Sequence, residues 1–411
     1  MSLRGFNNKG GESTGDGEVG ESPYPLIETE GELAELIEKL LPEPRYAVDT
    51  EFHRERTYYP DLALVQIAWS DGLVLIDPLK VDIAPLAEVL EGDGVAVMHA
   101  SSQDLEVMLR ATGTVPARLF DTQIAAGFIG LRSPSLAALH DQFLGMRLEK
   151  GDRLTDWLAR PLEPRQLSYA AGDVLHLLEI DAEIRRRLVE ENRLVWAEDE
   201  CELARQKGVT IREPSEAWRR IKEARSLRGS AQKVIRHLAA WREELASKQN
   251  RPPRYVVSDL ALVSMAQRPP KNSEGFKRIR GFDERQLKVA ERERVLEVIR
   301  EGLNSTLPAP PRNDARDDIR DLRPAVTLIG AWLAQYARDH DLDPALVGSR
   351  SDIEELLRGS PDPRLGSGWR KRLVGEPIRR LVAGEVALAF EGDGRISLEE
   401  RSFTPVSPPP E

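Results

Sequence analysis

Short apolar stretches of strand length cover the first part of the chain and are separated by polar turns. Residues 45–52, 62–69 and 73–77 each have the length and apolar content of a strand. The second and third stretches are separated by Ser70-Asp71-Gly72, a sequence typical of a hairpin turn. We therefore expect three consecutive strands, with the last two paired as a hairpin.

The next segment alternates between helical and strand-like patterns. Residues 83–90 have helical spacing, and 95–99 form a short apolar run typical of a buried strand. Serines open an expected helix at 101–110, and 118–121 fit a last short strand before the chain turns helical at Thr122. A meander followed by alternating helices and strands indicates an α/β domain, with a mixed sheet and helices on its faces.

Further changes of pattern divide the rest of the chain. From Pro164 the apolar positions recur at helical spacing until the pattern breaks around residues 208–214. Two mainly helical regions follow, joined by a Pro-rich stretch, and Trp332 and Leu333 of the second echo Leu238 and Trp241 of the first. The expected divisions are a disordered tail at 1–23, the α/β domain at 24–207, a helical domain at 215–304, a linker at 305–321, a second helical domain at 322–390 and a C-terminal tail at 391–411.

The charge is distributed unevenly along the chain. The formal net charge of −11, taken as an average, argues against a nucleic-acid partner. Residues 215–304, however, contain 21 Lys and Arg against 12 Asp and Glu, a net charge of +9, so the remainder carries −20. A solvated helix face would explain any single basic residue, but the whole module favours binding to a phosphate backbone.

Cysteine and histidine are too few for several kinds of site. The single Cys201 cannot form an internal disulfide, which is typical of a cytoplasmic protein, and it excludes zinc fingers and iron–sulfur clusters. The six histidines are scattered, so we expect any metal to be a hard cation held by carboxylates. No run of about 18 apolar residues occurs, and we expect no membrane association.

Three acidic motifs are candidates for that metal site. Asp49 and Glu51 lie two residues apart in an apolar strand, so their carboxylates share a face and repel each other unless a cation relieves them. Asp104 follows the strand at 95–99, and Tyr169 and Asp173 lie four residues apart on one helix face. Taken alone, each motif is also explained by a solvated strand edge, a helix-dipole interaction or a surface pair.

Together the motifs form the order Asp-x-Glu, Asp and Tyr-x-x-x-Asp, which resembles the DEDDy pattern of 3′-to-5′ exonucleases. The segments YAVDTEFHRERTYYPDLALVQIAW, MHASSQDLEVMLR and LSYAAGDVLHLLEI, within residues 45–180, resemble bacterial ribonuclease D. The basic region at 215–304 resembles the HRDC domain that follows the catalytic domain in that family, and 322–390 resembles a second, more divergent one. The resemblance implies a ribonuclease H-like α/β catalytic domain followed by two all-α HRDC-like domains.

The resemblance also assigns roles to the five motif residues. It implies two divalent ions, Mg²⁺ or Mn²⁺, with Asp49, Glu51 and Asp173 holding the ion that activates water. Asp49, helped by Asp104, would hold the ion at the leaving group. Tyr169 would orient the attacking water, because a phenol with an ordinary pKa near 10 is a poor base at neutral pH.

Four further residues are candidates for substrate contacts. Thr50 and Phe52 flank the acid Glu51, and His99 ends the expected strand before Asp104. Trp157 could stack on a base. Core packing is an alternative for Phe52 and Trp157, and a hydrogen-bonded histidine at a strand end is an alternative for His99.

The implied activity is that of a cytoplasmic 3′-to-5′ exoribonuclease that releases nucleoside 5′-monophosphates. The implied partner is structured RNA with a 3′ tail, such as a tRNA precursor, and no obligate protein partner is indicated. A 3′-to-5′ DNA exonuclease is an alternative, because no motif reveals contacts to the 2′-hydroxyl. A nucleic-acid-binding protein with an inactive nuclease fold is another, although the four acids are all present.

Overall fold

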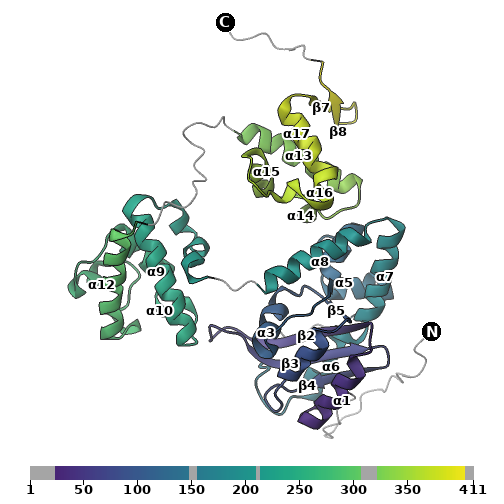
Figure 1. Cartoon of the computed structure of the whole chain (residues 1–411), viewed down its shortest axis with the longest axis horizontal. Coiled ribbons are helices and arrows are strands. Elements are labelled where there is room, and N and C mark those ends of the chain that lie inside the picture. The colour runs from purple at the N-terminus through teal and green to yellow at the C-terminus, as the bar shows by residue number, and fades with distance from the viewer. Residues whose placement is uncertain (1–23, 148–154, 210–212, 307–321, 403–411) are drawn as a thin grey trace.

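The computed structural model describes residues 24–147, 155–209, 213–306 and 322–402. The expected tails at 1–23 and 403–411 and most of the expected linker lie outside these ranges. Figure 1 shows a mixed α/β unit, a helical unit beside it and a third unit next to helices α5 and α8. Among the described helices, none has the length and apolar content needed to cross a membrane.

The first unit contains a six-stranded sheet in the order β1-β4-β3-β2-β5-β6. Its strands are β1 Leu26–Ile27, β2 Arg45–His53, β3 Asp61–Trp69, β4 Gly72–Ile76, β5 Val95–Met98 and β6 Leu119–Asp121. The pairs β2·β3 and β3·β4 are antiparallel, whereas β1·β4, β2·β5 and β5·β6 are parallel. The expected meander and mixed sheet are therefore confirmed, and β1 is an addition that the sequence pattern did not predict.

Helices cover both faces of this sheet. They are α1 Glu30–Leu40, α2 Ala87–Leu90, α3 Ser102–Thr112, α4 Thr122–Ala126, α5 Leu136–Leu144, α6 Pro164–Leu175, α7 Leu177–Glu190 and α8 Leu194–Gly208. Alternate residues of β2 and β3 separate the two faces: Val48 and Val65 pack in the cluster that contains α1, α2 and α3. Ala47 and Leu64 lie in the smaller clusters that contain α6. The face that carries Ala47 also carries Asp49 and Glu51.

The second unit is helical, as expected, with no strand among its described residues. Its helices are α9 Gly229–Lys248, α10 Pro253–Val256, α11 Asp259–Gln267 and α12 Val289–Asn304. They enclose a separate core that includes Trp218, Leu238 and Phe276. One residue of the first unit, Tyr58 in the β2–β3 loop, packs against this core.

The third unit differs from the all-α expectation. Its helices are α13 Arg323–Asp339, α14 Pro344–Val347, α15 Arg350–Leu357, α16 Gly368–Arg370 and α17 Glu376–Ala383, and they are followed by the antiparallel strands β7 Val386–Phe390 and β8 Ile396–Glu400. The expectation of a tail from 391 is therefore wrong for residues 396–400. The hairpin is ordered because Ile396 and Leu398 pack against the core of this unit and the Gln335 amide bonds both backbone polar groups of Ile396.

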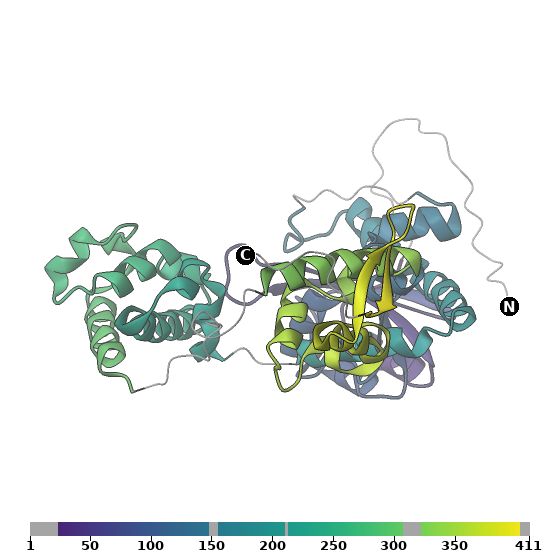
Figure 2. The ribbon, with the colours of Figure 1, turned by 90° about the horizontal axis from the view of Figure 1, so that it is seen from above.

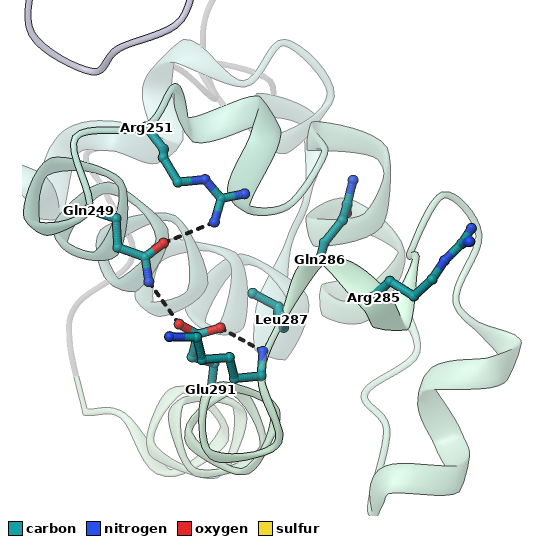
Figure 3. A pocket seen from close by; sticks show the side chains of 7 residues that line it. Gln249, Arg251, Arg285, Gln286, Leu287 and Glu291 are labelled. Atoms are coloured by element: carbon teal, nitrogen blue, oxygen red, sulfur yellow. Dashed lines mark hydrogen bonds between the residues drawn. The ribbon is translucent and has the colours of Figure 1, made fainter.

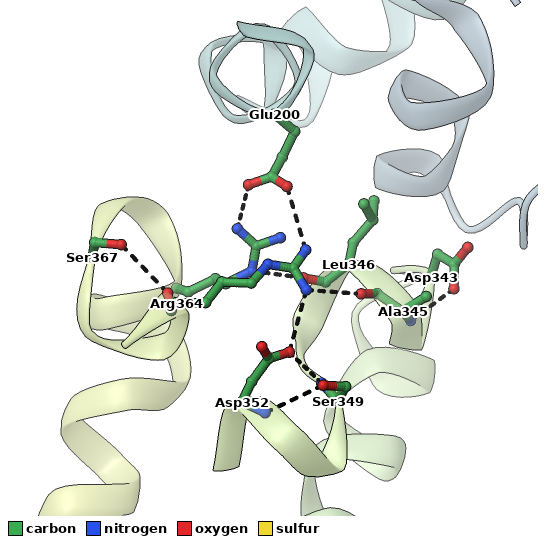
Figure 4. A network of polar contacts seen from close by, with 9 residues as sticks. Glu200, Asp343, Ala345, Leu346, Ser349, Asp352, Arg364 and Ser367 are labelled. Atoms are coloured by element: carbon green, nitrogen blue, oxygen red, sulfur yellow. Dashed lines mark hydrogen bonds and ion pairs between the residues drawn. The ribbon is translucent and has the colours of Figure 1, made fainter. Parts of the chain in front are cut away.

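The third unit shares one hydrophobic core with the α/β unit. Trp369 packs against two residues of the α/β unit, stacked on Trp196 at a centroid distance of 5.5 Å and edge-on to Phe128 at 5.3 Å. Glu200 of α8, only 8% exposed, binds Arg370 and Arg364 of the third unit (Figure 4). Seen from above, the third unit accordingly lies over the α/β unit, whereas the second unit extends to one side (Figure 2).

Candidate active site

Strand β2 places the first two acids of the site. Asp49 and Glu51 alternate with the buried Val48 and Thr50, so both carboxylates project from the face that α6 covers. A register shift between Glu51 and Phe52 interrupts the pairing with β3 directly after the second acid. The expected common face is thus confirmed, and β2 lies inside the sheet between β3 and β5.

Helix α6 brings the tyrosine and the last acid over the same face. Ala170 and Ala171 are fully buried and pack in one cluster with Leu64 and Leu75 of the sheet. Two adjacent small side chains let the helix approach the strands closely, which leaves Asp173 directly above β2. One oxygen each from Asp49, Glu51 and Asp173 lie within 4.8 Å of one another.

The fourth acid lies beside this group rather than within it. Asp104 is in the first turn of α3 and is only 8% exposed. The Thr50 hydroxyl donates a hydrogen bond of 2.5 Å to Asp104 Oδ1. Thr50, expected as a substrate contact, therefore holds an acid in place through its side chain.

Burial raises the pKa of all four carboxylates, and for Asp49 and Glu51 the neighbouring acids raise it further. Burial raises the pKa of Glu51 to about 8, with contributions from the charges of Asp173 and Asp104. Burial followed by the charges of Asp104, Asp173 and Glu51 raises the pKa of Asp49 well above its ordinary value. Burial also raises the pKa of Asp173 to about 7 and that of Asp104 to about 6. A cluster that resists ionisation in this way provides a strong electrostatic driving force for a cation.

The side chains around the cluster fit a hard divalent cation. The donors are carboxylate oxygens, which are the ligands that Mg²⁺ and Mn²⁺ prefer, and no histidine or cysteine joins this group in the described chain. Gln66 of β3 is opposite Asp49 in the sheet and fully buried, and neither of its amide atoms has a hydrogen-bond partner among the described residues. A bound ion with ordered ligands and water would provide this amide with hydrogen-bond partners.

Tyr169 and Trp157 form one wall of the site. Their ring centroids are 6.1 Å apart, and burial followed by the charge of Asp173 raises the pKa of Tyr169 to about 12. The Arg160 guanidinium donates to both oxygens of the fully buried Asp77, at 2.6 and 2.7 Å, and also to the Trp157 carbonyl at 2.7 Å. This ion pair, for which the sequence pattern gave no role, fixes the segment that carries Trp157 against the sheet.

The other two expected substrate contacts, His99 and Phe52, are half-buried. His99 Nδ1 is 2.9 Å from the Thr122 hydroxyl, and burial lowers the pKa of the ring. Phe52 is half-buried at the register shift. Asp121 accepts hydrogen bonds from Gln123 N and Ile124 N and so caps α4.

Comparison with known proteins places this site in a family. A family model described as 3′-5′ exonuclease matches residues 24–189, and one described as HRDC domain matches 231–299. Ribonuclease D of Acidiphilium cryptum (strain JF-5) is 36% identical over 382 residues, which cover 90% of this chain and 96% of that protein. Ribonuclease D of Escherichia coli (strain K12) is 35% identical over 376 residues, which cover 87% and 98%.

The crystal structure of Escherichia coli RNase D matches this chain with a TM-score of 0.80 at 33% sequence identity, covering 88% of this chain and 98% of that one. The fold and the site thus define a 3′-5′ exonuclease domain followed by an HRDC domain. The chain belongs to the ribonuclease D family and is a 3′-to-5′ exoribonuclease.

Proposed function

We propose that this enzyme uses two divalent ions, Mg²⁺ or Mn²⁺, to remove nucleotides one at a time from the 3′ ends of structured RNA in the cytoplasm. Precursors of tRNA with a 3′ tail are the substrates that we expect. The observation that carries the proposal is the convergence of Asp49, Glu51 and Asp173 within 4.8 Å, with Asp104 held beside them by Thr50. The solved Escherichia coli relative is described as an exoribonuclease involved in structured RNA processing, which supports the substrate class.

Each residue of the cluster has a distinct role in this proposal. Asp49, Glu51 and Asp173 would hold the ion next to the attacking water, and Asp49 with Asp104 would hold the ion next to the leaving 3′ oxygen. Such ions, when bound, lower the pKa of a coordinated water and neutralise charge on the leaving oxygen. Tyr169 keeps its proton at neutral pH because its pKa is raised to about 12, so it orients the water by a hydrogen bond. Trp157, beside Tyr169, offers an aromatic face to the terminal base.

A digest of paired 5′-labelled RNA and DNA oligonucleotides tests the activity and its metal dependence. With Mg²⁺ or Mn²⁺ we expect the RNA to shorten by one nucleotide at a time, and we expect EDTA to stop the reaction, because every donor of the cluster is a carboxylate. Cleavage in EDTA would contradict the metal assignment, and a ladder on DNA alone would favour the DNA exonuclease.

The basic module has a pocket whose chemistry suits an RNA strand. It has a volume of about 710 Å³ and is lined by Gln249, Arg251, Arg285, Gln286, Leu287, Lys288 and Glu291 (Figure 3). The lining contains three cations and one carboxylate, and Glu291 already accepts hydrogen bonds from Gln249 Nε2 and Lys288 N at 2.8 and 2.7 Å. The cations suit phosphates, and the amides and Leu287 suit a base.

Contacts with the catalytic unit hold this pocket in place. Asn250, between two of the pocket residues in sequence, accepts a hydrogen bond of 3.1 Å from Tyr59 N in the β2–β3 loop. The Tyr58 hydroxyl donates to the buried Glu243 at 2.7 Å, and Arg220 also binds Glu243. On the other side of the loop, the Arg110 guanidinium lies 3.6 Å from the Tyr59 ring centroid and so ties the loop to α3. We infer that RNA whose 3′ end is in the active site passes this pocket.

Removing positive charge from the pocket tests whether the RNA passes it. For the double substitution Arg285→Ala and Lys288→Ala we expect weaker binding of single-stranded RNA and a salt dependence (log K against log salt) shallower by about 1.4, because each phosphate contact contributes about 0.7. Fluorescence anisotropy at several salt concentrations measures both quantities. The pair Lys271→Ala and Arg278→Ala removes the same charge from exposed sites of this module outside the pocket, and an equal loss in both double variants would contradict a role specific to the pocket.

The third unit repeats the order of the HRDC unit. In each, a long helix with a buried tryptophan, Trp241 or Trp332, precedes a four-residue helix that begins with proline. A helix capped by a serine side chain then follows, at Ser258 or Ser349. This order supports our proposal that the third unit is a second, divergent HRDC-like domain, to which the hairpin β7–β8 has been added.

A further inference from the structure

Gln66 is a buried polar residue next to the proposed metal site, and no described residue hydrogen-bonds its side-chain amide. It lies in the middle of β3 between Val65 and Ile67, which pack in the core on the opposite face of the sheet. Its side chain is 0% exposed, and both Nε2 and Oε1 lack a hydrogen-bond partner among the described residues. A glutamine amide has two donors and an acceptor, and leaving such a buried polar group unpaired lowers the stability of the fold. An apolar side chain would be favoured here if the strand only had to pack.

The position of Gln66 points to Asp49. The two residues are directly opposite each other in the antiparallel pair β2·β3, and opposite residues of such a pair project from the same face about 4.5–5.5 Å apart at Cβ. Leu64 and Ala68, which flank Gln66 on this face, pack with α6, the helix that carries Tyr169 and Asp173. Gln66 is therefore enclosed between the acid of β2 and the helix that completes the site.

Asp49 needs an additional donor. One oxygen of its carboxylate lies within 4.8 Å of an oxygen of Glu51 and of Asp173, so the group is crowded by other acids, and an N–H donor offsets part of that crowding of negative charge. Outer partners that orient a metal-ligating carboxylate are a regular feature of metal sites. An amide N–H adds no charge of its own, so it can orient the carboxylate without competing with the ion.

We propose that Gln66 is a positioning residue of the metal site, and that its Nε2 donates a hydrogen bond to the Asp49 carboxylate when the ion is bound. This inference rests on the proposed metal-dependent function. No described residue pairs with the amide in the absence of the ion, so its burial lowers stability and is compensated by tighter binding of the ion.

The substitution Gln66→Met separates this role from ordinary packing. Methionine fills a similar volume without polar atoms, so the melting temperature of the metal-free protein should not fall. The dissociation constant for Mn²⁺, measured from the electron paramagnetic resonance signal of the free ion, should rise about tenfold or more. Activity should recover at high Mn²⁺ concentration. Gln66→Leu serves as a second variant if methionine prevents folding.

Leu75→Met is the matched control, because Leu75 is fully buried and faces Gln66 from the other side in β4. It should leave the dissociation constant for Mn²⁺ unchanged. Saturable Mn²⁺ binding in the wild-type enzyme with the same constant in Gln66→Met would overturn the positioning role alone. The absence of saturable binding in the wild-type enzyme would instead contradict the proposed metal site. A purely structural Gln66 would change the melting temperature and leave the binding constant unaffected.

Discussion

Replacing Asp49 with asparagine should lower the rate of RNA cleavage at least about a thousandfold, equivalent to about 4 kcal/mol of transition-state stabilisation. Asp49 is the acid that both proposed ions share, and asparagine preserves its shape while removing the charge that a hard cation requires. Single-turnover cleavage of a 5′-labelled RNA measures the loss. Anisotropy should show RNA binding largely intact, because the pocket of the basic module is unchanged.

The same substitution should make the metal-free protein more stable at neutral pH. The pKa of Asp49 is raised in the folded protein, so ionising this group as pH rises past its ordinary value of 3.8 destabilises the fold. Asparagine removes that destabilisation, and the melting temperature in EDTA at pH 7.5 should increase. Asp141→Asn, on an exposed position of α5, is the control and should change neither quantity. Retained cleavage by Asp49→Asn would refute the metal assignment, whereas loss of both cleavage and stability would indicate a folding defect.

Local periodicity is what made the catalytic strand predictable. The two-residue repeat of a strand fixes Asp49 and Glu51 on one face whatever the rest of the fold does, and the structure confirms this. The helix at Asp121 could be predicted for the same reason, because a cap is a contact between near neighbours in sequence. The link between Thr50 and Asp104 spans 54 residues, and no local pattern reveals which strand-face residue meets which helix.

The other differences from expectation concern elements that are held in place by residues far away in the sequence. The two-residue β1 is too short to show a period, and it exists because it pairs with β4. The hairpin β7–β8 depends on Gln335 and the core of the third unit. Cys201 had no expected role, yet its thiol lies in the core shared with the third unit and accepts a hydrogen bond of 3.2 Å from Asp121 N. The apolar face of α8 predicts that the helix is buried, but it does not identify the segment that packs against it.

Glu200, beside the shared core, is a residue whose loss should strongly lower stability. Its carboxylate binds Arg370, itself 3% exposed, and Arg364, which also binds Asp352 (Figure 4). Removing one partner of a buried ion pair leaves a charge in the interior and costs about 3–5 kcal/mol. Because folded domains are stable by only about 5–15 kcal/mol, Glu200→Ala should release the third unit at a much lower urea concentration than in the wild type.

Tryptophan fluorescence provides a direct measure of that release, because Trp196 and Trp369 stack across the contact. We expect Glu200→Ala to add an early fluorescence transition, while the RNA ladder in the absence of urea remains metal-dependent. Arg186→Ala removes two surface arginine–glutamate pairs on α7, to Glu183 and Glu190, and should shift the midpoint little. Equal shifts in the two variants would show that the Glu200 network does not hold the units together.

The pH dependence of the same transition gives an independent test. Burial alone would raise the pKa of Glu200, but the hydrogen bond and charge of Arg370, with the charge of Arg364, hold it below its ordinary value of 4.5. A depressed carboxylate pKa stabilises the folded state above the ordinary value, and this contribution is lost as pH falls through the folded-state pKa. Acidification below about pH 4.5 should therefore bring the wild-type transition towards that of Glu200→Ala.

The active-site acids respond in the opposite sense, since their raised pKa values make protonation favourable to the metal-free fold. Lowering the pH should consequently loosen the contact between the units while relieving repulsion in the site, and the interface fluorescence separates the two effects.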